Sequence, residues 1–471
     1  MRRLLLLLGV ASLCACAHAP VNEPLTRASI ETGYRYANVT LPREDDTFVV
    51  LTFSGGGSRA AAFSYAVLKE LQRVRFGDGT TLLDRVDLIS SVSGGSFISM
   101  YYGLHGPEGL DDFKTRFLDR DIEGMLFKAA ANPKNLVRLL SPTFNRIDLA
   151  AELYDRVLFD GKTYADLHAA QAGPRPRPFI VVNSTELDLG SRFEWTQDQF
   201  DPICSDLSKT NVARAVAASS AFPVLLTPMA LRNYAGTDCQ FVMPSWVAPA
   251  RQDLETRAAA HRSALELEAY RNPRRAWLHL MDGGIADNIG LRGTLHAMTS
   301  AETWQMDDPT GRRTGYTLQP AIEKRSIRRL VVIVVNAATG SDLNFDTKHS
   351  NPGLPKILGS ISFTPMKNFS FDSMQALVAI MHAQSGGQAI LPVPDPQATD
   401  RQAGLPVVHF YPVILGFDSV ADAQFREQLN SIGTNFALKA GQLELLERAA
   451  RDLLASSPAY QQFLKDSGGT Q

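Results

Sequence analysis

The chain has 471 residues, of which 45% are hydrophobic and 20% are charged, so it is long enough to bury one large core or two. Its formal net charge of -2 excludes an overall electrostatic attraction to nucleic acid. The sequence has no cysteine or histidine spacing typical of a zinc site, so we expect no bound metal.

The N-terminus is typical of an export signal. A basic start is followed by an apolar run that is too short to remain as a membrane-spanning helix. Leu13-Cys14-Ala15-Cys16 resembles a bacterial lipobox, which implies a signal peptide over residues 1–15 and lipid attachment to Cys16. Because Ala17 follows that cysteine, we expect an exported lipoprotein of the outer membrane, on its periplasmic or surface face. An ordinary signal peptide cleaved near Ala17 or Ala19 is the alternative.

Two cysteines remain after export. Cys14 would leave with the signal and Cys16 would carry lipid, so Cys204 and Cys239 are left in an oxidising compartment. A disulfide between them and a pair of free buried thiols are both compatible with the sequence.

Residues 16–46 lack periodicity and are interpreted as a tether and a leading segment. One catalytic domain is expected over residues 47–465, with helical insertions at about 110–170 and 251–275. Thr47–Phe53 is predicted to be a buried strand, and a helix is expected from Ala60 to about Arg73. Strands that alternate with helices predict a mostly parallel α/β sheet.

The turn between this strand and helix is the glycine-rich stretch Ser54-Gly55-Gly56-Gly57-Ser58-Arg59. Its backbone N–H groups would lie at a helix N-terminus, which favours anions. The loop could bind a phosphate, although no Lys-Ser/Thr pair follows it as in a P-loop. It could equally be an oxyanion hole. A structural tight turn is the third interpretation.

Ser93 is the candidate nucleophile. The apolar run Leu88-Ile89 leads into Ser90-Ser91-Val92-Ser93-Gly94-Gly95, and a helix-like segment follows. This order is typical of a nucleophile elbow, in which a sharp strand-to-helix turn presents the serine hydroxyl. Taken alone, the motif also fits an ordinary structural turn.

The next part of the chain is predicted to be helical over about residues 110–170, either as a cap over the site or as helices packed on the sheet. A charged, alanine-rich helical insertion facing solvent is expected at 251–275. The remaining expectations are a buried strand at 327–335, a loop-rich stretch at 342–368, a helix at 369–384, a short strand at 407–411, and helices over 425–464 with a break near 456–458.

A third motif follows another apolar strand. Trp277–Met281 ends in Asp282-Gly283-Gly284, which places a carboxylate at the end of a strand. The order of glycine loop, serine elbow and strand-end Asp-Gly-Gly resembles the patatin-like phospholipase family. Residues 179–190 and 212–223 also resemble the family's motifs, so the similarity extends over about residues 48–288. Ser91 and Ala60 stand where the family usually has glycine, and both are small.

The resemblance implies a three-layer α/β/α sheet and a lipid acyl hydrolase that uses a Ser-Asp dyad. Ser93 would attack a lipid ester or phospholipid, and Asp282 would act as general base. No cofactor is required. The groups expected to bind the oxyanion or another anion are the backbone of Gly55, Gly56 and Gly57, and Arg59, which could instead order the loop.

Three alternatives remain open. A Ser-Asp-His triad could form with His409 or His279, although His409 lies within a strand-like run. His279 is an odd number of positions from Asp282, so the two would point to opposite faces of a strand. The same site could act as an acyltransferase. The chain could also be a non-enzymatic lipid-binding lipoprotein.

Overall fold

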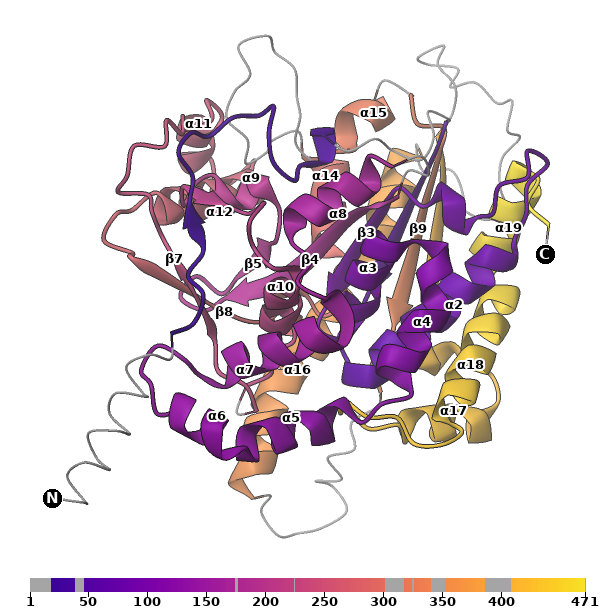
Figure 1. Ribbon diagram of the computed structural model, residues 1–471. Helices are drawn as coiled ribbons and strands as arrows, with labels where there is room; N and C mark the ends of the chain where they lie inside the picture. Colours follow the sequence, from indigo (N-terminus) through magenta and orange to yellow (C-terminus); the bar gives the residue numbers. More distant parts are fainter. Residues whose placement is uncertain are drawn as a thin grey trace, which may run out of the picture.

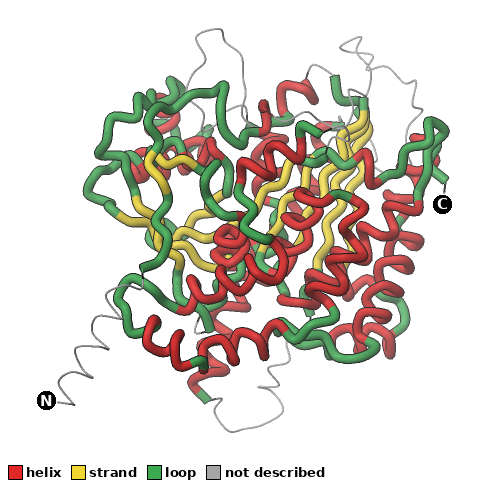
Figure 2. The backbone as a smooth tube through the Cα atoms, in the orientation of Figure 1, coloured by secondary structure: helices red, strands yellow, loops and turns green. Residues whose placement is uncertain are grey.

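The computed structural model describes residues 18–38, 46–173, 177–223, 225–300, 317–323, 326–339, 353–385 and 408–470. The predicted signal peptide and Cys16 lie outside these residues. A central sheet is covered by helices on both faces (Figures 1 and 2). The three-layer α/β/α arrangement predicted from the sequence is therefore confirmed.

The main sheet of the described chain has eight strands in the order β10-β9-β2-β3-β4-β8-β7, with β5 paired to β4. The five strands from β10 to β4 are parallel, whereas β8, β7 and β5 pair antiparallel. Their bounds are β2 (Thr47–Phe53), β3 (Leu88–Val92), β4 (Phe179–Glu186), β5 (Ser191–Glu194), β7 (Met229–Arg232), β8 (Trp277–Asp282), β9 (Arg329–Asn336) and β10 (His409–Gly416).

The parallel strands are apolar on both faces. β2 and β9 are buried along almost their whole length, as expected of strands covered by helices on each side. β10 continues through Pro412, five residues beyond the predicted end at 411. Proline is tolerated there because β10 is an edge strand, so the missing N–H breaks no bond to a neighbour.

Helices α2 (Gly57–Arg73), α3 (Gly94–His105), α8 (Tyr164–Gln171) and α10 (Val212–Ser219) lie in front of the sheet in Figure 1. α13 (Gly284–Asp287), α14 (Arg292–Thr299) and α16 (Leu354–Gln384) follow the antiparallel part of the sheet, and α14 and α16 lie behind it. The C-terminal helices are α17 (Ala423–Asn430), α18 (Gln442–Ser456), which packs on α2, and α19 (Pro458–Ser467). A short α15 (Gln319–Glu323) precedes β9.

The block at 110–170 is helical, as predicted. It contains α4 (Leu110–Phe113), a π-helical turn η4 (Lys114–Leu118), α5 (Ile122–Ala131), α6 (Pro133–Arg138), α7 (Arg146–Tyr154) and a second π-helical turn η5 (Asp155–Phe159) before α8. The side chains of Asp121, Asn132, Asn145 and Thr163 each accept a hydrogen bond from a backbone N–H at the start of a helix. These N-caps explain why a single helical block divides at these positions.

Two expectations require correction. The stretch 342–368 was expected to be loop-rich, but α16 already begins at Leu354; residues 340–352 lie outside the described part. Pro355 lies in the first turn, where its missing N–H costs nothing, and Pro365 is accommodated inside the helix. The insertion at 251–275 is also less solvent-facing than expected. Its helix α12 (Ala258–Tyr270) packs on α11 (Val247–Arg251), and Tyr270 is fully buried.

The leading segment is anchored to the domain over its described residues. A two-residue strand β1 (Glu23–Pro24) pairs with β6 (Ser205–Asp206), and a 3₁₀ turn η1 spans Tyr36–Asn38. Arg35 is buried and pairs with Asp201 at 2.6 Å. Of the tether and leading segment inferred for residues 16–46, the described residues contact the domain from His18 onward. In the described part of the chain, no helix has the length and hydropathy needed to cross a membrane.

Candidate active site

Ser93 occupies a strained turn between β3 and α3. Its backbone angles are φ 50° and ψ −119°, in a region that side-chain-bearing residues rarely adopt. The next residue must be glycine, because a Cβ on Gly94 would lie 2.1 Å from the carbonyl oxygen of Gly57. The predicted strand-serine-helix elbow is therefore present, and its strain is typical of a functional position.

Ser91, which replaces the first glycine of the usual elbow, fits its position. Its side chain is fully buried, and its Oγ accepts a hydrogen bond from Ser99 Oγ at 2.6 Å. The partner lies on the first turns of α3, so the replacement links the strand to the helix that follows. Ala60, the other departure, is buried inside α2.

The structure brings Ser93, which follows β3, next to Asp282, the last residue of β8, although the two strands run in opposite directions. Ser93 Oγ donates a hydrogen bond to Asp282 Oδ2 at 2.8 Å, although the residues are 189 positions apart. Asp282 Oδ1 accepts from the backbone N–H of Gly284, also at 2.8 Å. Both carboxylate oxygens are thus held, and one is directed at the serine hydroxyl.

The environment of Asp282 favours proton transfer near neutral pH. Its side chain is buried, and burial raises its pKa from the usual 3.8 to about 6, against the opposing effect of its hydrogen bonds from Gly284 and Ser93. A carboxylate with such a pKa is a better base than a solvent-exposed aspartate, because a general base is most effective when its pKa lies near the working pH.

The end of α10 holds both members of the pair. Ser219 Oγ accepts from the N–H of Ser93 at 2.9 Å and donates to the carbonyl of Asn183 at 2.6 Å. The carbonyl of Ala221 accepts from the N–H of Asp282 at 3.1 Å. Residues 218–223 resemble a family motif, so the sequence indicated that this segment matters. It assigned no role to Ser219.

Of the three amides expected from the glycine loop, that of Gly55 is already bonded to the protein, whereas those of Gly56 and Gly57 are available. The N–H of Gly55 donates to the carbonyl of Asn288 at 2.9 Å, so Gly55 is not free to bind an oxyanion and this expectation is wrong. Within the described part of the chain, the N–H groups of Gly56, Gly57 and Gly94 donate to no protein acceptor. They lie at or just before the first turns of α2 and α3, where the helix dipoles favour negative charge. The residue after the nucleophile is a usual oxyanion donor, and this rule could have identified Gly94.

Arg59 orders the loop and does not face a ligand. Its side chain is buried, its Nε donates to the carbonyl of Ala337 at 2.8 Å, and its terminal nitrogens donate to the carbonyl of Ile432 and to Thr434 Oγ1. The expectation that Arg59 binds an anion is therefore wrong, because protein acceptors already engage the guanidinium.

The segment 432–436 supports the glycine loop and was not among the residues predicted for the site. Besides its contacts to Arg59, the carbonyl of Asn435 accepts from the N–H of Ser58 at 2.8 Å. Gly57 has φ +60°, and a Cβ there would lie 2.2 Å from the same carbonyl. The 425–464 region was expected to be helical with a break only near 456–458, but residues 431–441 between α17 and α18 are not helical. Nothing in the local pattern indicates their long-range contact with the glycine loop.

Neither histidine completes a triad in the structure. His409 is the first residue of the edge strand β10, three strands away from β3, whereas Ser93 directly follows the last residue of β3. His279 lies on β8 with its side chain exposed, whereas Asp282 on the same strand is buried.

Aromatic and thioether side chains flank the dyad. Phe222, which follows the α10 segment bonded to Asp282, stacks on Phe363 of α16 with ring centroids 5.4 Å apart. Met366 Cε would lie 2.5 Å from a Cβ on Gly284, so α16 lies directly against the Asp-Gly-Gly turn. A separate cavity of about 420 Å³ is lined by paired charges, including Arg192 and Glu194, and neither dyad residue contributes to it.

Comparison with known proteins gives one family match. The model of the family described as patatin-like phospholipase matches residues 51–295, more than half of the chain. No curated protein matches significantly.

Among solved structures, the chain is similar to human GIVD cytosolic phospholipase A2, with 14% identity and a TM-score of 0.42; the match covers 89% of this chain and 63% of that one. The complex of that human protein with methyl gamma-linolenyl fluorophosphonate gives 14% identity and a TM-score of 0.39, covering 90% and 60%. The match thus spans less than two thirds of the human protein.

Proposed function

The chain belongs to the patatin-like phospholipase family, a family of lipid acyl hydrolases, and from this premise we propose that it cleaves lipid esters with a Ser93–Asp282 dyad. The observation that carries the proposal is the 2.8 Å hydrogen bond from Ser93 Oγ to Asp282 Oδ2. It aligns a strained serine with a buried carboxylate whose pKa is raised to about 6. Nucleophile and base within hydrogen-bond reach are the minimum for covalent catalysis.

In the first half of the reaction, Ser93 Oγ attacks the ester carbonyl carbon while its proton passes to Asp282. The carbonyl oxygen becomes an oxyanion, which the N–H groups of Gly56, Gly57 and Gly94 would stabilise. When the intermediate collapses, the C–O bond to the alcohol breaks and the alcohol leaves with the proton from Asp282. The product is an acyl-serine.

In the second half, Asp282 accepts a proton from water as the water oxygen attacks the acyl-serine. The second oxyanion collapses, releases the carboxylic acid and returns the proton to Ser93. No cofactor takes part. The apolar flank formed by Phe222, Phe363 and Met366 suits an acyl chain better than a charged substrate.

Labelling with a fluorophosphonate, which reacts covalently with activated serines, tests the proposal. We expect parent protein to be labelled, Ser93→Ala to be inert, and Asp282→Asn to be labelled far more slowly. Hydrolysis of a soluble short-chain ester should fall by several orders of magnitude in both variants.

Ser91→Ala is the matched control, because Ser91 is a buried serine two residues away and should not carry the label. Retention of ester hydrolysis by Ser93→Ala, or failure of folded parent protein to react with the probe, would contradict the proposed dyad.

We further propose that the chain is an exported lipoprotein attached to the outer membrane by lipid on Cys16. The lipobox-like sequence supports this placement. The disulfide between Cys204 and Cys239 is in keeping with an oxidising compartment. Two or more acyl chains on one cysteine would make the attachment firm.

A further inference from the structure

Three large apolar side chains are exposed on two consecutive helices. Phe127 of α5 is 58% exposed, Leu136 of α6 is 53% exposed, and Leu140, two residues after α6, is 68% exposed. Other residues of this pair, Ala129, Ala130 and Leu139, pack inward on a small cluster around Phe144 and Leu149. The two helices therefore pack one face on the protein and leave apolar side chains exposed to solvent on the other. A single exposed apolar residue is ordinary, but a group of them indicates an interaction site.

The charge of this segment is basic. Residues 122–144 contain three basic side chains and one acidic side chain. Lys128 and Lys134 are exposed, whereas Glu123 accepts a hydrogen bond from the N–H of Phe436. We define the α5–α6 surface as Phe127, Leu136 and Leu140 with these two lysines. Exposed apolar side chains beside lysines are typical of helices that lie in the interface of an anionic membrane.

The proposed lipid attachment site lies next to this surface. His18 Nδ1 is 2.8 Å from Thr143 Oγ1, and the N–H of Ala19 donates to the carbonyl of Thr143 at 2.8 Å. Thr143 is three residues beyond Leu140. Cys16 precedes His18 by two residues, which span at most about 7 Å of extended chain. Lipid on Cys16 would therefore hold the end of the α5–α6 surface close to the bilayer.

The chain on either side of this surface contacts segments that lead to the site. At its start, the N–H of Ile122 donates to the carbonyl of Phe436, in the segment that supports the glycine loop. At its far end, Thr227 Oγ1 donates to Asn145 Oδ1 at 2.5 Å, and Thr227 lies in the chain that follows Ser219 and Phe222. α5 and α6 lie together along one side of the molecule in Figure 1.

From these contacts we propose that the α5–α6 surface inserts into the interface of the membrane to which Cys16 is attached and turns the dyad toward that membrane. The enzyme would act on lipids of its own bilayer. The inference rests on the proposed lipid anchor and on the proposed hydrolase function.

The test uses the Cys16→Ser protein made without residues 1–15, which removes both the lipid and the signal peptide, so that the surface alone must bind. Sedimentation with vesicles of phosphatidylethanolamine and phosphatidylglycerol measures binding. We expect Leu136→Ser/Leu140→Ser to weaken binding about tenfold or more, because two apolar side chains lose their burial in lipid. Lys128→Glu/Lys134→Glu should also weaken binding, and the residual binding should respond less to salt.

The control is Val242→Ser/Leu254→Ser. These residues are 62% and 61% exposed and belong to the α11–α12 region, on the other side of the molecule in Figure 1. The control should bind like the Cys16→Ser protein, and equal binding of the α5–α6 variant would overturn the inference. Hydrolysis of a soluble short-chain ester separates a failure of membrane docking from a failure of the proposed hydrolase function. Every variant should hydrolyse this ester at the rate of the parent protein. An inactive parent protein would refute the hydrolase function and not the docking surface.

Discussion

Asp282 combines two properties that oppose each other. Burial raises its pKa because the ionised form loses hydration, and the hydrogen bonds from Gly284 and Ser93 partly restore the preference for the ionised form. The result is a base that ionises only near neutral pH. The position of this balance determines the pH range in which the dyad can work.

The pH dependence of catalysis should follow this ionisation. The pKa of Asp282 is raised from 3.8 to about 6, and only the ionised form can accept the proton of Ser93. We therefore expect kcat/KM for a soluble ester to be level above about pH 6 and to fall about tenfold for each pH unit below it. Circular dichroism at each pH would separate this titration from acid unfolding. A profile that stays level to pH 4 would contradict a base with a raised pKa at this position.

At the scale of single residues, the sequence predicted the catalytic pair better than the residues that hold the pair in place. The positions of Ser93 and Asp282 follow from local patterns, since each ends an apolar strand and precedes glycines. Ser219 and the occupied amide of Gly55 depend on which backbone groups meet across more than a hundred residues, whereas Gly94 follows from its place directly after the nucleophile. Local propensity carries no information on such contacts.

Among the elements, strand positions and the mostly parallel arrangement were predictable, but the antiparallel direction of β8 was not. The apolar run at 277–282 forms β8 as expected, yet β8 runs antiparallel to β4 and brings Asp282 to the site opposite Ser184. Direction depends on the connection through α11 and α12, which the sequence indicates only as a helical insertion. The start of α16 was missed because its proline, glycine and serine content favours loops, whereas packing against α13 and β10 stabilises a helix.

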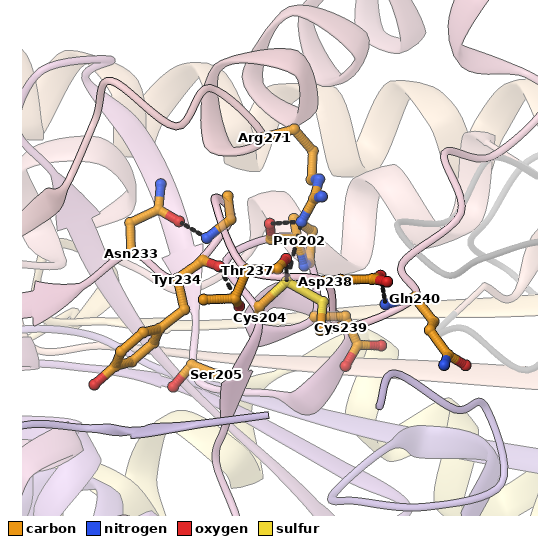
Figure 3. The surroundings of a disulfide bond; sticks show 12 residues. Pro202, Cys204, Ser205, Asn233, Tyr234, Thr237, Asp238, Cys239, Gln240 and Arg271 are labelled. Atoms are coloured by element: carbon orange, nitrogen blue, oxygen red, sulfur yellow. Dashed lines mark hydrogen bonds between the residues drawn. A yellow bond between two sulfur atoms is a disulfide. The ribbon is translucent and has the colours of Figure 1, made fainter. Parts of the chain in front are cut away.

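The disulfide joins two loops and thereby fixes the N-terminal segment. Cys204 and Cys239 are bonded, with 35 positions between them in the sequence (Figure 3). The carbonyl of Cys204 accepts from the N–H of Leu25, and that of Cys239 accepts from the N–H of Ala28, both at 2.7 Å. Arg271 donates to the carbonyl of Pro202 beside the bond. The segment that leads from the proposed anchor is thus held by a cross-linked element.

Removing this bond should affect stability without affecting chemistry. We expect Cys204→Ser/Cys239→Ser to lower the free energy of unfolding by about 3–4 kcal/mol, because a loop of this length gains entropy in the unfolded chain. Urea denaturation measures the loss, and kcat on a soluble ester should be unchanged because neither cysteine contacts the dyad. Parent protein in reductant should approach the stability of the variant. An unchanged urea midpoint in the variant would show that the bond does not constrain the unfolded state.

At the scale of the whole molecule, three features occupy the same region. His18 and Ala19 contact Thr143, the α5–α6 surface lies next to Thr143, and the flanking residues Ile122 and Asn145 contact Phe436 and Thr227 in segments that lead to the site. A short lipid anchor and an apolar surface would act as two linked contacts with one membrane. Linked contacts strengthen each other, because the first raises the effective concentration of the second.

This linkage makes the length of the anchor an experimental variable. A flexible Gly-Ser linker of about 20 residues between Ala17 and His18 would let the domain move about 25 Å from the bilayer, in place of a few ångströms. In lipidated protein on vesicles, we expect the linker alone to reduce phospholipid turnover only slightly, because an intact α5–α6 surface still docks. Combined with Leu136→Ser/Leu140→Ser, it should reduce turnover by more than the product of the two separate effects, since neither contact then orients the domain. Turnover of a soluble ester is the control and should not change. Independent, multiplicative effects would mean that anchor and surface do not act on the same membrane contact.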